Sequence, residues 1–251
     1  MSPHRYPLLE RTCTGREVIA SIQARIDALL VQRSPVEVLE AGCGSASMFS
    51  FPPHARLVGI DLSSEQLARN TRLDEAIQGD LCSYPLPPER FDLVVCWNVL
   101  EHLDQPDLAM QRFATTLKPG GLIVLALPNV YSFQGAVTRF TPHAFHVWFV
   151  RNVFRREWAG KEGRGPFPTY LRRAVSPPGL QGLAQQLGLE VEWSHLYEGG
   201  QQQRLMRLVP VSRPFFRSLD LLEVLSRGSI RPRLAATAWV LSRPPANNPT
   251  A

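Results

Sequence analysis

The sequence predicts an α/β fold, an open doubly wound sheet with a ligand site at the carboxyl ends of its strands. The first observation is a short apolar run that ends in a turn with two glycines, Gly42 and Gly44. The second is another apolar run, 57–61, which ends in the carboxylate of Asp61. Glycines let the backbone approach a ligand closely, and a carboxylate after the next strand can accept hydrogen bonds from both hydroxyls of a ribose. Together these features predict a nucleoside site.

A dinucleotide is disfavoured as the ligand. The G-x-G-x-x-G fingerprint of nicotinamide enzymes needs a third glycine at position 47, where this chain has Ser47. Glu40 lies two residues before the first glycine, and its negative charge would oppose a phosphate. A carboxylate at that place suits a cationic ligand or an amino-acid ammonium group. A nicotinamide-dependent oxidoreductase is therefore disfavoured.

The N-terminal elements of the sheet follow in order. Apolar residues at helical spacing predict a leading helix over 16–31, which Ser34-Pro35 ends. Only the segment 45–56 separates the glycine turn from the second strand, and it contains Pro52-Pro53. We expect the first crossover helix to be short or replaced by a loop. Pro106 precedes a further helix, predicted over 107–117.

The C-terminal elements complete the sheet. Ser176 is placed to cap a helix over 177–187 that Gly188 ends. The segment 189–197 alternates like a strand, and 235–241 is expected to be the final strand, antiparallel to it.

Five segments, taken in order, carry a resemblance to one enzyme family. The segment 38–44 resembles motif I of class I S-adenosylmethionine-dependent methyltransferases, (E/D)-x-G-x-G-x-G, although the third glycine of the family falls at Ala46. The others resemble the second strand and helix start, the end of the third strand, the fourth strand with its Glu-His-Leu turn, and the approach to strand five: 57–67, 76–81, 91–103 and 117–127. The chain is most similar to the small-molecule branch that includes ubiquinone-pathway O-methyltransferases.

The resemblance implies a Rossmann-like, doubly wound, seven-stranded sheet with an antiparallel last strand, an N-terminal helix and two insertions. It implies S-adenosyl-L-methionine as cofactor, with Asp61 on the ribose and Asp80 on the adenine amine. The family positions that match here give these expected cofactor residues: Glu40, Gly42, Gly44, Asp61, Leu62, Asp80, Leu81 and Asn98. For Asp61 a helix N-cap is the alternative role, and for Asp80 an ordinary loop carboxylate.

The predicted domain organisation has five parts. They are an N-terminal helical cap (1–35), a cofactor-binding core (36–128), an aromatic lid insertion (129–175), the C-terminal part of the core (176–243) with a basic amphipathic insertion (199–234), and a disordered tail (244–251). Family members place substrate-specific lids after strand five, so the aromatic insertion is expected to line the acceptor pocket. Most of its aromatic residues are expected simply to pack its helices.

Charge is distributed unevenly along the chain. Residues 1–130 carry 11 basic and 15 acidic side chains, whereas residues 131–251 carry 16 and 7. The basic half indicates an anionic partner, which could be an acidic substrate, the surface of an anionic membrane or a nucleic acid, or it reflects solvated arginines alone. A nucleic acid is disfavoured because the chain has only two lysines, Lys118 and Lys161, and no separate RNA-binding module.

Three histidines are candidate catalytic residues. Methyl transfer needs a base only if the acceptor must lose a proton. His102 follows the fourth strand near the expected position of the methyl group, with a structural role in the turn as the alternative. His143 and His146 lie in the expected lid, and without an acidic or cysteine partner nearby they predict no metal site. The Asn-Pro-Pro-Tyr type motif of amino-group methyltransferases is absent, which favours an oxygen or carbon acceptor.

The sequence therefore favours a methyltransferase that acts on a small, apolar or lipid-like metabolite, most simply at oxygen. The alternatives are an RNA methyltransferase and a non-catalytic protein of the same fold. Four unpaired cysteines, the absence of a long apolar run and the polar N-terminus predict a reduced cytoplasmic protein, with peripheral membrane contact as an option. No feature indicates an oligomeric state.

Overall fold

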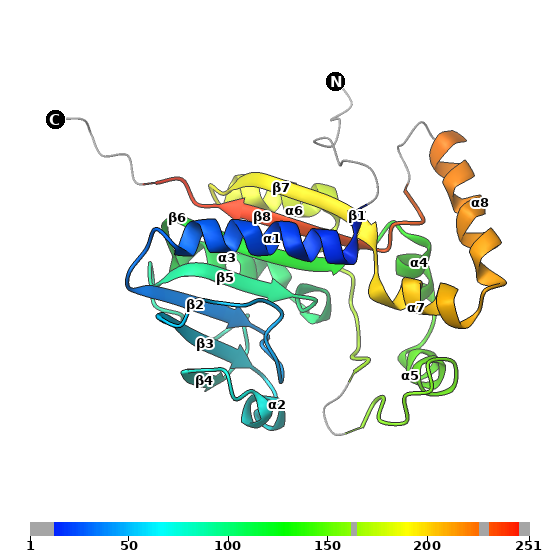
Figure 1. Cartoon of the computed structure of the whole chain (residues 1–251), viewed down its shortest axis with the longest axis horizontal. Helices are drawn as coiled ribbons and strands as arrows, with labels where there is room; N and C mark the ends of the chain where they lie inside the picture. The colour runs from blue at the N-terminus through cyan, green and yellow to red at the C-terminus, as the bar shows by residue number, and fades with distance from the viewer. Residues whose placement is uncertain (1–12, 162–164, 226–230, 246–251) are drawn as a thin grey trace.

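A computed structural model describes residues 13–161, 165–225 and 231–245. Its described strands form a single sheet in the order β1-β7-β8-β6-β5-β2-β3-β4 (Figure 1). The strands are β1 (Cys13–Thr14), β2 (Val36–Ala41), β3 (Ala55–Asp61), β4 (Glu75–Gln78), β5 (Phe91–Trp97), β6 (Leu117–Pro128), β7 (Glu190–Glu198) and β8 (Ala236–Ser242).

The helices flank this sheet or lie beside it. They are α1 (Gly15–Leu30), α2 (Ser64–Arg69), the 3-10 turn η1 (Leu100–His102), α3 (Pro106–Thr116), α4 (Phe133–Phe140), α5 (His143–Asn152), the 3-10 turn η2 (Arg173–Val175), α6 (Pro177–Gln186), α7 (Gly200–Leu208) and α8 (Ser212–Leu225).

The strand pairing confirms the predicted fold class. Strands β2 to β6 are parallel to one another, and β8 runs antiparallel to both β6 and β7. The strand order reverses between β2 and β5, which creates a topological switch point at the carboxyl ends of those two strands. The sequence did not predict β1, which pairs with β7 through Thr14 and Glu198 and brings the start of α1 to the same edge.

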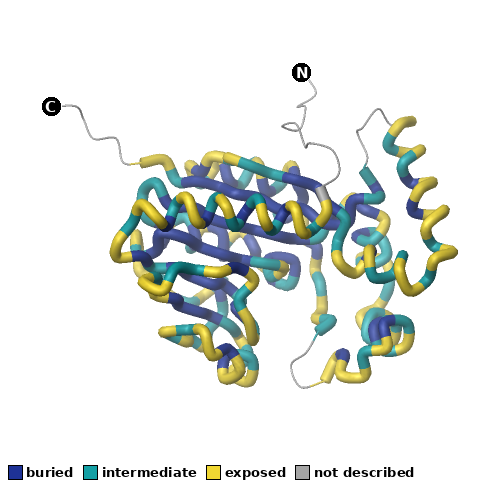
Figure 2. Tube along the Cα trace, in the orientation of Figure 1, coloured by how far each residue is buried: buried dark blue, intermediate teal, exposed yellow. Residues whose placement is uncertain are grey.

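Helices cover the sheet on both faces, so its central strands are buried throughout (Figures 1 and 2). On one face α1 presents Val18, Ile22, Ile26 and Leu30, which recur every four residues and are fully buried. A capping box at Thr14 begins this helix. On the other face lie α3 and α6, and Ser176 caps α6 as predicted. Burial on both faces explains why the strands read as continuous apolar runs.

The two expected insertions form one unit, which we call the helical lobe and define as α4, α5, α7 and α8. The rings of Phe133 and Phe215 lie 4.8 Å apart, and Arg204 of α7 donates to the carbonyl oxygen of Phe154 at 2.8 Å. Leu205 packs against the small core formed by Val150, Phe154 and Ala159. The two insertions occupy the expected places in the chain, and the structure adds that aromatic and aliphatic side chains from each bury one another.

Two smaller predictions concern the first crossover and the C-terminal tail. Residues 43–54 contain no helix, so the first crossover is a loop, as the short connection and its prolines required. Most of the expected disordered tail, residues 246–251, lies outside the described residues. None of the helices in the described ranges is long and apolar enough to cross a bilayer.

Candidate active site

The glycine turn after β2 requires glycine at its first position. Gly42 has a φ of 70° and Gly44 a φ of 53°, both in the left-handed region. The N–H of Gly42 donates to the carbonyl oxygen of Ile60 at 2.8 Å, which joins the turn to the end of β3. A Cβ at Gly42 would lie 2.5 Å from a methyl carbon of Val99. The turn after β5 therefore packs directly on the turn after β2, at the switch point.

Asp61 ends β3 at the same edge of the sheet. Its Oδ2 accepts a hydrogen bond from the N–H of Gly44 at 2.9 Å, and its Oδ1 accepts one from the N–H of Ser63 at 2.9 Å. The Ser63 side chain, and not Asp61, caps α2. Because each carboxylate oxygen can accept two hydrogen bonds, Asp61 keeps acceptor capacity for ribose hydroxyls. The geometry is compatible with the predicted ribose contact.

Glu40 lies beneath the glycine turn and is only 3% exposed. The hydroxyl of Ser47 donates to its carboxylate, so the residue that replaces a third dinucleotide-type glycine holds this acid in place. Burial raises the pKa of Glu40. Burial, helped by the charges of Asp61 and Glu40, also raises the pKa of the neighbouring Cys43 thiol to about 12, which keeps it protonated.

The other expected cofactor residues follow β3, β4 and β5. Oδ1 of Asp80 accepts from the N–H of Cys82 at 2.9 Å. Asn98 has a φ of 56°, a conformation that asparagine tolerates, and its N–H donates to the carbonyl oxygen of Ala126 at 2.8 Å. Leu62 is exposed, whereas the side chain of Leu81 belongs to the core, which leaves its backbone for contact with a ligand.

These residues fit S-adenosylmethionine. A side chain at Gly42 would prevent the turn from approaching a ligand closely. The carboxylate of Asp61, which has free acceptor capacity, lies at the end of the neighbouring strand β3. The carboxylates of Glu40 and Asp61 suit an adenosyl group whose sulfur carries positive charge, and they oppose a pyrophosphate. In this fold such ligands bind outside the carboxyl ends of the strands, where these groups lie.

His102 lies in η1, directly after β5, and contacts the segment that leads from the lobe back to the core. Its Nδ1 is 2.7 Å from the carbonyl oxygen of Pro168. A carbonyl oxygen only accepts, so Nδ1 carries the proton and the neutral ring has its lone pair on Nε2. Burial lowers the pKa of His102, and the bond to Pro168 opposes that effect. A neutral imidazole with an available Nε2 can accept a proton.

Glu101 is a site residue that the sequence-based selection missed. It is 3% exposed, and its Oε2 has no hydrogen-bond partner in the described ranges of the chain. Its Oε1 lies 3.9 Å from Nε2 of His102. Burial raises the pKa of Glu101 to about 8. Burial and, to a smaller extent, the charge of Glu101 raise the pKa of Tyr197 to about 12. The signal in the sequence was an acidic residue next to His102 within an otherwise apolar turn.

The other two histidines lie in the helical lobe, on α5. Nε2 of His143 is 2.8 Å from the carbonyl oxygen of Pro166. The segment 166–169 is therefore contacted by His143 on one side and His102 on the other. His146 contacts the hydroxyl of Thr141 at 2.6 Å, within its own lobe, and burial lowers its pKa. The structure brings His102 to the strand edge and leaves His146 away from it, while the catalytic roles of all three stay predictions.

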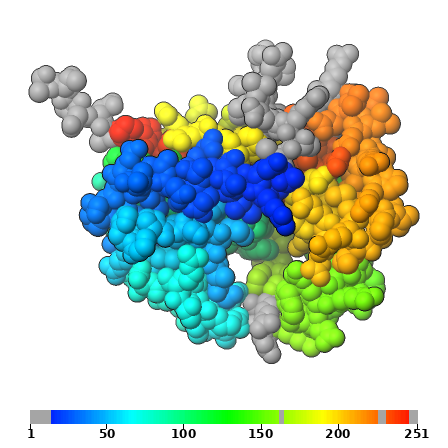
Figure 3. All heavy atoms as spheres, in the orientation of Figure 1, coloured from blue at the N-terminus to red at the C-terminus, as the bar shows by residue number. Residues whose placement is uncertain are grey.

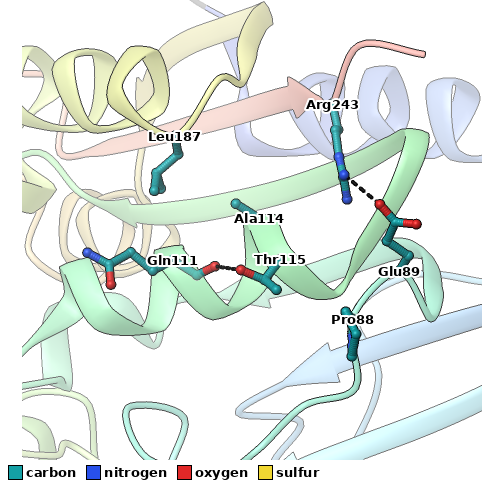
Figure 4. Close-up of a pocket in the computed structure, with 7 residues that line it drawn as sticks. All are labelled: Pro88, Glu89, Gln111, Ala114, Thr115, Leu187 and Arg243. Atoms are coloured by element: carbon teal, nitrogen blue, oxygen red, sulfur yellow. Dashed lines mark hydrogen bonds and ion pairs between the residues drawn. The ribbon is translucent and has the colours of Figure 1, made fainter. Parts of the chain in front are cut away.

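A hollow separates the sheet from the helical lobe at the carboxyl ends of β2 and β3 (Figure 3). A different surface hollow lies at the opposite, amino edge of the sheet (Figure 4). It is bordered by the ion pair between Arg243 and Glu89, whose nitrogen and oxygen are 2.6 Å apart. That second hollow is distant from the glycine turn. The candidate active site is therefore the hollow between the sheet and the helical lobe.

Comparison with known proteins agrees with this geometry. A family described as a methyltransferase domain matches residues 15–193. A malonyl-[acyl-carrier protein] O-methyltransferase from Enterobacter lignolyticus is 26% identical over 202 residues, which cover 74% of this chain and 78% of that protein. A ubiquinone biosynthesis O-methyltransferase from Bradyrhizobium sp. is 30% identical over 142 residues, covering 46% and 52%.

Coverage of several relatives is partial. A Mycolicibacterium smegmatis protein named as an S-adenosylmethionine-dependent methyltransferase is 35% identical over 120 residues, and the chain spans 45% of its length. Among solved structures, a candidate methyltransferase from Bacillus halodurans is similar with a TM-score of 0.56 and 17% identity, covering 91% of this chain and 99% of that one. A phosphoethanolamine N-methyltransferase from Haemonchus contortus, solved with S-adenosyl-L-methionine, has a TM-score of 0.55 and 16% identity, covering 89% and 52%.

The strand order, the glycine turn, the acid after β3 and the match over 15–193 converge. This chain belongs to the methyltransferase domain family, with the Rossmann-like fold and the S-adenosylmethionine cofactor of the class I enzymes.

Proposed function

We propose that this protein transfers a methyl group to an oxygen atom of a small, apolar or lipid-like metabolite. The observation that carries this proposal is the pairing of His102 and Glu101 at the end of β5, with a buried Glu101 oxygen that lacks a partner among the described residues. A buried carboxyl oxygen without a hydrogen bond is costly, so a hydroxyl brought by the acceptor would satisfy it.

The cofactor residues have a holding role. When bound, S-adenosylmethionine supplies a methyl group already activated by the positive charge of its sulfur. Asp61 accepts hydrogen bonds from the ribose hydroxyls, and Glu40 places negative charge under the glycine turn. Gly42 and Gly44 allow the backbone to approach the cofactor closely. Much of the rate enhancement then comes from alignment of the acceptor, which can contribute about 7–11 kcal/mol.

His102 accepts the proton of the acceptor hydroxyl. Its Nδ1 is held by Pro168, which leaves Nε2 unprotonated, and its lowered pKa keeps the ring neutral at pH 7. Glu101 binds the same hydroxyl through its free oxygen and orients it. The described ranges contain no cluster of three or more histidine, cysteine or acidic residues that could hold a metal ion.

Aromatic residues next to His102 support an apolar acceptor. The ring of Phe167 lies edge-on to the His102 ring at 5.9 Å, and both Phe167 and Tyr170 are exposed. Exposed aromatic groups beside a catalytic pair usually line a binding site for apolar ligands. The two O-methyltransferase relatives support oxygen as the atom that is methylated.

The test is a methyl-transfer screen with labelled S-adenosylmethionine. The acceptors are phenols, long-chain carboxylic acids, aliphatic amines and total RNA. Formation of a base-stable methyl ether that His102→Gln reduces supports the proposal. A base-labile methyl ester also supports oxygen as the acceptor atom, but a carboxylate has no proton to lose at neutral pH, so its methylation does not test His102. Methyl transfer to amines or RNA alone would contradict it. Binding of the cofactor with no transfer to any of the four classes would favour the non-catalytic alternative.

A further inference from the structure

The helical lobe contains a groove between α7 and α8 that the methyl-transfer site does not use. Its volume is about 390 Å³. From α7 it is lined by Gln203, Met206 and Arg207, from α8 by Arg213, Phe216 and Arg217, and from the segment before β8 by Arg233.

Helical periodicity gathers these residues. Positions 203, 206 and 207 share one face of α7, and positions 213, 216 and 217 share one face of α8, because residues three and four apart are neighbours on a helix. The two faces meet across the groove, where Nε of Arg213 donates to the carbonyl oxygen of Met206 at 3.1 Å. Phe216 is buried and forms an apolar floor.

The charges in the groove are not balanced. Arg233 binds the carboxylates of Asp220 and Glu198, each at 2.6 Å, so its charge is compensated. Arg207, Arg213 and Arg217 are exposed and have no carboxylate partner within the described part of the chain. Three cations that converge on one concave surface repel one another unless an anion lies between them.

We propose that this groove binds the phosphate group of an anionic ligand. Guanidinium groups present paired N–H donors that match phosphate oxygens, so three of them can satisfy a single phosphate. Two exposed apolar side chains lie close by in the chain, Leu208 at the end of α7 and Val211 in the turn before α8. A phosphate joined to an apolar chain is therefore consistent with the groove and these neighbouring residues. The ligand is either a soluble phosphate ester or the headgroup of an anionic phospholipid.

This site is independent of methyl transfer. Within the described ranges, none of the residues that line the groove forms a hydrogen bond or ion pair with Asp61, His102 or Glu101. Arg207→Gln with Arg217→Gln removes two of the converging charges and leaves Arg233 and its ion pairs intact. The matched control is Arg16→Gln with Arg139→Gln, which removes two exposed arginines elsewhere, on α1 and α4.

The experiment measures binding to the whole chain in two arms at low ionic strength. Calorimetry uses glycerol 3-phosphate, and sedimentation uses vesicles of phosphatidylglycerol compared with phosphatidylcholine. We expect binding in at least one arm, weakened about tenfold or more in the groove variant, since two of the three converging guanidinium groups are removed. Binding in both arms or to glycerol 3-phosphate alone identifies a soluble ester, and binding to phosphatidylglycerol alone identifies a lipid headgroup.

Two results would overturn the proposal. One is an absence of binding in both arms by the unmodified chain. The other is an equal loss in the groove variant and the control, which would show that only net charge matters. Circular dichroism and S-adenosylmethionine affinity, both expected to be unchanged, establish that the groove variant is folded.

Discussion

Nδ1 of His102 lies 2.7 Å from the carbonyl oxygen of Pro168, a residue 66 positions later in the chain. The neighbouring N–H of Tyr170 donates to the carbonyl oxygen of Glu101 at 2.9 Å. The segment that returns from the helical lobe is therefore hydrogen-bonded to both His102 and Glu101, the proposed catalytic pair. Because the bond to Pro168 selects the tautomer of His102, the position of this segment decides whether Nε2 is available as a base.

His102→Gln tests the base. We expect kcat for methyl transfer to fall about 10²–10⁴-fold, the usual contribution of a general base, with S-adenosylmethionine affinity unchanged. In the unmodified protein, activity is expected to fall as the pH drops through the lowered pKa of His102, because a protonated ring cannot accept a proton. The acidic limb should thus lie below pH 6.5. His54→Gln, an exposed histidine before β3, is the control. A normal kcat in His102→Gln would eliminate His102 as the base.

Glu101→Gln tests the buried carboxyl through stability. Its pKa is raised from 4.5 to about 8, so between these pH values the native chain holds a proton that the unfolded chain releases. The free energy of unfolding should then decrease with rising pH, by up to about 1.4 kcal/mol per pH unit from this group. Urea unfolding at several pH values should show this slope relative to Glu101→Gln. Glu192→Gln, on the exposed side of β7, should retain the slope. A constant difference between Glu101→Gln and the unmodified chain would contradict the raised pKa.

Asp61→Ala tests the ribose contact. We expect S-adenosylmethionine to bind about tenfold more weakly or worse, because hydrogen bonds to a charged acceptor are lost. The change also leaves the N–H groups of Gly44 and Ser63 without their acceptor, so some stability is lost as well. Asp61→Asn keeps an acceptor oxygen and should be milder. Asp27→Asn, exposed on α1, is the charge control. Calorimetric affinity that stays unchanged in a folded Asp61→Ala protein would refute this placement of the ribose.

Gly42→Ala tests the contact between the two turns. A side chain there adopts a left-handed conformation and collides with Val99, so we expect a loss of about 2–4 kcal/mol in the free energy of unfolding. Val99→Ala in the same chain should restore part of the loss by removing the collision, while the backbone strain persists. Denaturant unfolding of the single and double variants measures this coupling. Simple additivity would mean that the two turns do not press on each other.

His143→Ala separates a positioning role from a catalytic one. Loss of its bond to Pro166 should loosen the segment 166–169 and raise KM for the acceptor severalfold, with kcat and cofactor affinity nearly unchanged. His146→Ala, on the same helix but bonded to Thr141, is the matched control and should change neither constant. A fall in kcat as large as that of His102→Gln would instead make His143 a catalytic residue.

The cofactor half of the site was predictable from the sequence because its residues are close together and constrained by local rules. Gly42 needs a left-handed backbone, Asp61 ends an apolar strand, and strand ends in a doubly wound sheet meet at one edge. Glu101 lies in the Glu-His-Leu turn that the sequence shows, but only the tertiary structure buries its carboxyl and leaves Oε2 without a partner among the described residues.

The arrangement of the helical lobe could not be predicted from the sequence. The sequence indicated an aromatic insertion and a basic amphipathic insertion, but not that Phe133 packs on Phe215 across more than eighty intervening residues. Helical spacing could place Arg207 on a face of α7 and Arg213 on a face of α8, yet it could not predict that the faces meet.

The sequence by itself determined the doubly wound sheet from β2 to β8 and the edge at which a cofactor is expected, but not β1. Backbone conformation and apolar periodicity act over a few residues, and few topologies are consistent with them. Only the tertiary structure decided the partner of His102, the isolation of the Glu101 oxygen and the joining of the two insertions. These depend on contacts between distant segments, whose geometry is set by side-chain packing throughout the molecule and is not recorded in any local pattern.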